Sequence, residues 1–325
     1  MLTNKAKKTL SYAFKIAILA LAFFFIYQRI EKNKDNLHNF LQLIATITSA
    51  KVIFTLTIII ILMLVNYVLE SFKWWKLTRL LYPITIWQAI ESVFCGLTWA
   101  VFTPNRIGQY GGRVMFLPVH KRIHGVFSMI VGELGQSVIT NVLGASSLLW
   151  FLFTFLNLNK WLMALISILA LSLILAMIVF YFNIKWFVSL LNRIKFLKKY
   201  HRFFDTMGRY NTAELTNIML FCLARFFVFS FQYYLIIHLL VPELPMVTIL
   251  LILFIFLFIQ SALPSLDILD IGVRAITAST LFSLVTTKTM AIVVAVSIIY
   301  IVNLIVPAII GSIFVFKLKF FDRAY

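Results

Sequence analysis

The chain alternates between long apolar runs and short, strongly polar segments. Six runs approach or exceed the roughly 20 residues that a helix needs to cross a bilayer: 11–27, 51–70, 126–156, 161–182, 216–240 and 290–316. Two further apolar runs, 84–102 and 246–263, each lead into a polar segment that contains a proline. This pattern predicts an all-α polytopic membrane protein with six spanning helices and two re-entrant hairpins.

Composition agrees with this pattern. Hydrophobic residues make up 62% of the chain, whereas soluble domains contain roughly 45–50%. Apolar runs recur so often that no soluble catalytic domain fits between them, and residues 1–325 are expected to form one integral membrane domain. The sequence contains none of the Ser-x-x-Lys, His-Glu-x-x-His or Gly-x-Ser-x-Gly patterns, so we do not expect an enzyme.

The net charge of +18 is concentrated in a few clusters outside the apolar runs. With six spans and two hairpins, all of these clusters fall on one side of the membrane, as the positive-inside rule requires. The segment 183–212 is the most basic of them and is expected to be a cytoplasmic loop, with both termini cytoplasmic. The expected partners are therefore anionic lipid headgroups, and nucleic acid is not expected.

The segment 103–113 is unusual because it places two arginines and three glycines between apolar runs. Arg106 and Arg113 would be costly at membrane depth, so they must lie in a protein-lined cavity or at the surface. In a cavity they could bind a lipid phosphate in bidentate fashion; otherwise they snorkel to the interface or pair with Glu91. Gly108 and Gly112 would let the backbone approach a second backbone or a ligand.

Other charged residues lie within or beside the apolar runs. Glu133 and Arg225 are expected either to form a buried pair between facing helices or to belong to the binding site. Asp267 and Asp270 either couple binding to cations or protons, or have a structural role, in which they cap the short helix that follows or pair with Arg274.

Neither a metal site nor a cofactor is expected. His120 and His124 have helical spacing, but no third ligand accompanies them, so contact with the membrane interface is the preferred interpretation. Cys95 and Cys222 lie in apolar surroundings without disulfide or metal spacing.

Two blocks of the chain, 51–156 and 216–316, share the order span, hairpin, span. Pro104 precedes Arg113 by nine residues in the first hairpin tip, and Pro264 precedes Arg274 by ten in the second. The first block starts outside the membrane and the second inside, which predicts an inverted repeat. Many transporters use this architecture to build a site near the membrane midplane.

The first tip resembles the lysylphosphatidylglycerol synthase transmembrane region family, whose motif is roughly Pro-Gly-Arg-x-Gly-Glu-x-x-Arg after a membrane segment. The matching positions are Pro104, Arg106 and Gly108, with Arg113 about one residue late. Further similarities are a downstream glutamate and a second Pro/Gly-rich segment, at Glu133, Pro264, Gly272 and Arg274. Asn105 and Gln109 depart from the motif. The resemblance covers about residues 50–315.

The resemblance implies a stand-alone, flippase-like protein of a bacterial inner membrane. Such a protein would bind or translocate an anionic phospholipid or a lipid-linked headgroup, without the soluble aminoacyl-transferase domain of the bifunctional members. A nucleotide-binding loop is lacking, so movement would be passive or ion-coupled. The alternative is a non-transporting partner of an envelope enzyme, docked through the segment 183–212; a homo-oligomer is also compatible with the sequence.

Overall fold

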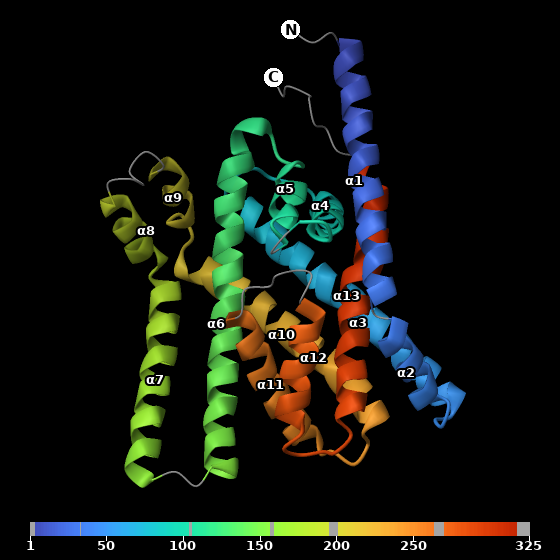
Figure 1. Ribbon diagram of the computed structural model, residues 1–325. Helices are drawn as coiled ribbons and strands as arrows, with labels where there is room; N and C mark the ends of the chain where they lie inside the picture. Colours follow the sequence, from blue (N-terminus) through green and yellow to red (C-terminus); the bar gives the residue numbers. More distant parts are fainter. Residues whose placement is uncertain are drawn as a thin grey trace.

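The computed structural model describes residues 4–32, 34–103, 106–156, 159–194, 201–262 and 270–316 (Figure 1). Helices make up 86% of the molecule and the described residues form no strand, which confirms the predicted all-α class. In chain order the elements are α1 (Asn4–Lys32), α2 (Lys34–Ile44), α3 (Ser49–Thr78), α4 (Ile86–Ala100), α5 (Gly108–Val114), the 3-10 turn η2 (Val119–Lys121), α6 (Arg122–Phe155), α7 (Lys160–Phe182), α8 (Ile184–Arg193), α9 (His201–Met207), α10 (Thr212–Leu240), α11 (Met246–Ala262), α12 (Asp270–Phe282) and α13 (Thr289–Val315).

Within the described residues, five helices are long and apolar enough to cross a membrane: α3, α6 together with η2, α7, α10 and α13. Two shorter apolar stretches, Tyr12–Gln28 within α1 and Met246–Ala262 in α11, accompany them. The sequence therefore correctly predicted an all-α membrane protein. The number of spans and the re-entrant character of the hairpins stay predictions.

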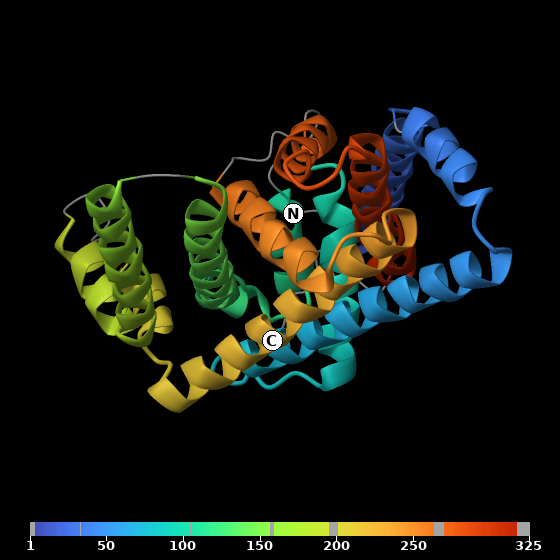
Figure 2. The same cartoon turned by 90° about the horizontal axis from the view of Figure 1, so that it is seen from below.

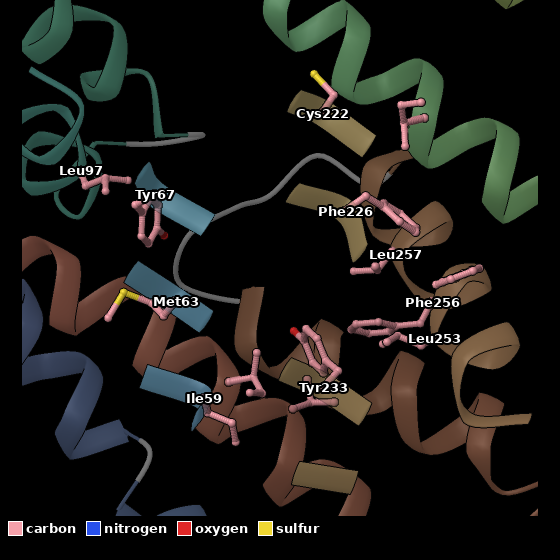
Figure 3. Packing of buried hydrophobic residues seen from close by; sticks show 14 of the residues in the cluster. Ile59, Met63, Tyr67, Leu97, Cys222, Phe226, Tyr233, Leu253, Phe256 and Leu257 are labelled. Carbon is pink, nitrogen blue, oxygen red and sulfur yellow. The ribbon is translucent and has the colours of Figure 1, made fainter. Parts of the chain in front are cut away.

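The two long helices α3 and α10 lie side by side through the centre of the molecule (Figure 2). Gln232 on α10 donates its side-chain amide to the carbonyl of Ile59 on α3, at 2.9 Å. Apolar side chains fill the remaining contact and extend to α11, where Tyr233 packs near Phe256 (Figure 3). This buried layer positions the polar side chains that lie further along the same two helices.

The shorter helices α4 and α11 each pack against a long helix from the other half of the chain. Helix α4 contacts α13, where a Cβ on Gly311 would lie 2.0 Å from the carbonyl oxygen of Phe94. Helix α11 contacts α6, where a Cβ on Gly144 would lie 3.1 Å from the carbonyl oxygen of Phe254. In both contacts a glycine lets the backbones touch.

These two contacts occupy equivalent places in the chain. Gly144 and Gly311 each lie 22 residues after the first residue of their helix, α6 and α13. Phe94 and Phe254 each lie eight residues after the first residue of theirs, α4 and α11. The α5–α6 connection lies at the upper end of the molecule in Figure 1, and the α12–α13 connection at the lower end.

Helices α7, α8 and α9 form an extension that reaches the rest of the molecule mainly through α6. The most apolar part of α7 contains no buried residue, whereas Tyr181 near the end of this helix is buried. The segment 183–212, expected as a basic loop, contains the short helices α8 and α9. His124 at the start of α6 contacts Thr206 of α9 at 2.7 Å, which fixes this extension to the bundle.

Candidate functional site

A buried glutamate on α3 binds three cationic side chains. Glu70 is 1% exposed, and its Oε1 lies 2.5 Å from Nη1 of Arg113. Its Oε2 lies 2.8 Å from Nζ of Lys73 and also accepts a hydrogen bond from Nη1 of Arg225. The four side chains come from α3, α5 and α10, and we call them the Glu70 cluster.

The local structure explains how Arg113 reaches this position. Helix α5 folds back onto α4 so closely that a Cβ on Gly112 would lie 2.6 Å from the Cα of Gly96. A Cβ on Gly108 would likewise lie 2.4 Å from the carbonyl oxygen of Trp99. The glycines of the first tip thus bring backbone against backbone, and neither lines the cavity described below. These close contacts hold α5 in a position from which the Arg113 side chain reaches Glu70 on α3.

Arg225 joins three helices and still faces open space. Its Nε donates to Oδ1 of Asn66 on α3 at 2.9 Å, and its Nη1 donates to Oε1 of Gln136 on α6 at 3.4 Å. The two hydrogens on Nη2 have no partner among the described residues. The side chain is 19% exposed and lines a cavity, so these two donors are available to a ligand.

The Glu70 cluster carries excess positive charge. Three cations surround one carboxylate, which leaves two positive charges without a counter-ion inside the cluster. Buried charges are costly unless they are paired, and this cost is greater among apolar helices than in a soluble protein. An anion bound next to Arg225 would lower this cost.

The cavity beside Arg225 has a volume of about 300 Å³ and lies between α3, α6, α10, α11, α12 and α13. Three arginines from different segments line it: Arg106, Arg225 and Arg274. The other polar lining side chains include amides and hydroxyls, at Asn66, Gln136, Thr140, Gln260, Ser261 and Asn303. This combination can hold an anion by charge and by hydrogen bonds together.

The other two arginines that line the cavity lie outside α10. Arg106 lies between α4 and α5 with a φ of 55°, a left-handed conformation that is uncommon for a residue with a side chain. Arg274 lies on α12, with its guanidinium carbon 5.7 Å from the ring centre of Tyr300 on α13. Arg106 and Arg274 therefore come from segments far apart in the sequence, and Arg225 on α10 lines the same cavity.

The structure changes the expected pairing of the charged residues. The predicted pair between Glu133 and Arg225 is wrong, because Arg225 binds Glu70 on α3, although α10 also contacts α6. Glu133 is half-buried and forms no ion pair within the described part of the chain. The predicted alternative of an Arg113–Glu91 pair is also wrong, because Arg113 binds Glu70.

Several other candidates have simpler positions. Asp267 lies outside the described residues, and Asp270 is described only as the first residue of α12. His124 contacts Thr206 and packs on the ring of Phe203 at 5.2 Å, so it belongs to the contact between α6 and α9. Within the described ranges, no group of three or more His, Cys, Asp or Glu side chains is arranged to hold a metal ion.

A second cavity, of about 310 Å³, lies between α6 and the extension formed by α7 and α8. Its lining is apolar apart from Ser137 and the Tyr181 hydroxyl, and it contains no charged side chain. It can accept hydrocarbon but offers nothing that would recognise a headgroup. The cavity with the three arginines is therefore the candidate site.

The sequence missed Glu70, the residue at the centre of the cluster. Glu70 stands at the end of the expected span 51–70, next to Lys73, which was interpreted as the basic end of that span. The helix in fact continues to Thr78, so both residues lie inside the molecule. Comparison of the chain with protein-family models, with curated proteins and with solved structures finds no match, so the assignment of a function depends on this geometry.

Proposed function

We propose that this chain is a flippase-like membrane protein that binds an anionic lipid headgroup in the arginine-lined cavity and moves it across the membrane. The observation that supports this most directly is the convergence of Arg106, Arg225 and Arg274 on one cavity between apolar helices. Arginine suits this task because its planar guanidinium matches phosphate and carboxylate oxygens in pairs.

The size of the cavity limits what enters it. Ligand pockets commonly have volumes of about 300–1,000 Å³, so a cavity of about 300 Å³ holds a headgroup but not a whole lipid. The acyl chains would then remain in the surrounding membrane while the headgroup is bound. Arg225 is already oriented by Asn66, Glu70 and Gln136, so little side-chain ordering is needed when the anion binds.

The proposal includes six spans, two re-entrant hairpins and an inverted repeat with both termini in the cytoplasm. The equivalent contacts of Gly144 and Gly311 support the repeat. The spacing that separates these two glycines also separates Gln136 from Asn303, and both of these residues line the cavity. The cavity thus lies where the two repeats meet, which is the usual place of a transport site in such folds.

The two hairpins would control access to the cavity. Arg106 belongs to the first hairpin and Arg274 to the second, so each repeat contributes a cation to the same ligand. Opposite movements of the two hairpins would expose the bound headgroup first to one leaflet and then to the other. We assign no coupling ion, and movement down the lipid gradient is the simplest mode.

The test uses liposomes that contain the purified chain and phosphatidylglycerol labelled on its headgroup. A membrane-impermeant quencher reports how fast lipid from the inner leaflet becomes accessible. We expect fast exchange with the wild-type protein and a loss of roughly tenfold or more in the double variant Arg106→Gln/Arg274→Gln, because about 1.4 kcal/mol of lost binding already gives that factor. Arg79→Gln, at an exposed position at the end of α3, is the matched control.

Equal exchange in the wild type and in the double variant, with both proteins folded by circular dichroism, would contradict translocation through this cavity. Protein-free liposomes give the background rate. The non-transporting partner role would then be the better explanation, with the segment 183–212 as the docking surface.

A further inference from the structure

We infer that the apolar cavity between α6, α7 and α8 binds one acyl chain of a membrane lipid. This site is separate from the arginine-lined cavity, and it goes beyond the proposed function without depending on it. The bound chain would fill the contact between α6 and α7, and it would thereby help to hold the extension formed by α7, α8 and α9 on the rest of the molecule.

Small side chains on both helices create the space. Ser137 on α6 and Ala176 on α7 both line the cavity. Tyr181 on α7 lies against α6 at Gly135, where a Cβ would be 2.9 Å from the tyrosine hydroxyl oxygen. The two helices are therefore in close contact at Tyr181, and beside this contact a cavity of about 310 Å³ lies between them.

The lining of the cavity suits hydrocarbon. Its apolar surface comes from Leu134, Val138, Ala176, Met177, Phe180 and Ile184. The hydroxyl of Ser137 accepts a hydrogen bond from Nδ2 of Asn141 at 3.0 Å, and the hydroxyl of Tyr181 donates to the carbonyl of Leu215 at 3.2 Å. Both lining hydroxyls thus have protein partners, whereas a buried water molecule needs about two to four polar partners of its own.

The cavity borders a surface that lipid chains would contact. Helix α7 is long and apolar enough to cross a membrane, and its most apolar part contains no buried residue. Two residues of this helix that line the cavity, Ala176 and Phe180, are exposed. A chain in the surrounding bilayer can therefore reach the cavity from the side of α7.

The size of the cavity and the energetics of filling it also favour an acyl chain. An apolar cavity of about 150 Å³ already holds a benzene molecule. The cavity beside α7, at about 310 Å³, therefore accommodates a stretch of acyl chain. A chain that enters from the bilayer remains among apolar groups, so the gain comes from dispersion contacts with the lining rather than from the release of water.

The experiment uses the full chain in liposomes that contain a small fraction of a phospholipid with a photoactivatable diazirine within one acyl chain. After illumination, mass spectrometry of proteolytic peptides identifies the labelled residues. Leu134 and Val138 are the diagnostic positions, because they line the cavity from α6 and Val138 is only 5% exposed. We expect the wild-type protein to be labelled at one or both of these positions.

A cavity-filling variant makes the test sharper. Ala176→Phe places a ring in the cavity lining and should lower the labelling of Leu134 and Val138 by roughly tenfold. Ala164→Phe makes the same change at an exposed position of α7 that is not a lining residue, and it should leave this labelling unaltered. Ser137→Leu fills the cavity from α6 and repeats the test should Ala176→Phe fold poorly.

Labelling of the exposed surface of α7 without labelling of Leu134 or Val138 would overturn the inference, because chains would then contact α7 without entering the cavity. Unchanged labelling of the two positions in folded Ala176→Phe and Ser137→Leu would also overturn it. The headgroup-exchange experiment tests the arginine-lined cavity, so the failure of the proposed function would be recognised separately from the failure of this site.

Discussion

At the scale of single residues, the stability of the site depends on Glu70. Three buried or partly buried cations share this one carboxylate, so its removal leaves all three without their counter-ion. Breaking a buried ion pair from one side typically costs about 3–5 kcal/mol, whereas an exposed pair contributes about 0–1 kcal/mol. Glu70 thus holds Arg225 in place at the cavity but does not itself line the cavity.

Glu70→Gln should therefore lower the thermal unfolding temperature in detergent, as followed by tryptophan fluorescence. The expected loss is about 3–5 kcal/mol of unfolding free energy. Glu31→Gln removes the carboxylate of an exposed pair with Lys34 and is the matched control, with little expected change. Indistinguishable unfolding temperatures for the two variants would mean that the Glu70 cluster does not stabilise the fold.

The sequence could predict the cations of the site but not their arrangement. Arginines among apolar runs are conspicuous, and Arg106, Arg225 and Arg274 do meet at one cavity. The ion pairs of Glu70 with Arg113 and Arg225 span 43 and 155 residues, and no local pattern encodes contacts of that range. This is why the predicted pairs Glu133–Arg225 and Arg113–Glu91 are wrong.

At the scale of elements, close backbone contacts hold α4 on α13 and α11 on α6. A side chain at Gly311 would meet the backbone oxygen of Phe94, which cannot rotate away. The sequence predicted the apolar runs that form these helices. The sequence did not indicate which helices contact each other. The residues around a glycine in an apolar run do not reveal which other helix that glycine will pack against.

Gly311→Ala should consequently destabilise the protein by more than 1 kcal/mol, since either α4 or α13 must shift. Gly272→Ala on α12 is the control, because a Cβ there meets no atom of the described residues within 4 Å. That control should be neutral or stabilising by up to about 1 kcal/mol, as expected for glycine replaced by alanine in a helix. Equal behaviour of the two variants in thermal unfolding would contradict the close contact of α4 with α13.

Helices α8 and α9 show why charge can conceal an element. The many basic residues of the segment 183–212 predict a loop, but the described residues include two short helices. Ile184 and Val188, spaced by one helical turn, are nevertheless buried, and Leu191 packs against the core. Lys185 follows Ile184 and is exposed, so α8 is amphipathic, with an apolar face toward the core.

At the scale of the whole molecule, the proposed inverted repeat makes a topological prediction. If the proposal holds, the α5–α6 and α12–α13 connections are equivalent, so they should face opposite sides of the membrane. Val119→Cys and Thr287→Cys place exposed thiols in these connections. The native thiols Cys95 and Cys222 are buried and would be replaced by alanine.

A membrane-impermeant maleimide applied to right-side-out and inside-out vesicles should label the two introduced thiols from opposite sides. The cytoplasmic side is expected for Val119→Cys, because the neighbouring residues are basic. Labelling of both positions from the same side would end the inverted-repeat interpretation. The binding of lipid in the cavity would then need a different route of access.

The Glu70–Lys73 pair also has a consequence for biogenesis. These two residues are three apart on α3, so they can neutralise each other as soon as that helix forms. Arg225 is synthesised 155 residues after Glu70 and cannot assist the insertion of α3. The early pair thus balances the charge of Glu70 while α3 inserts, and the later arrival of Arg113 and Arg225 gives the Glu70 cluster its excess positive charge.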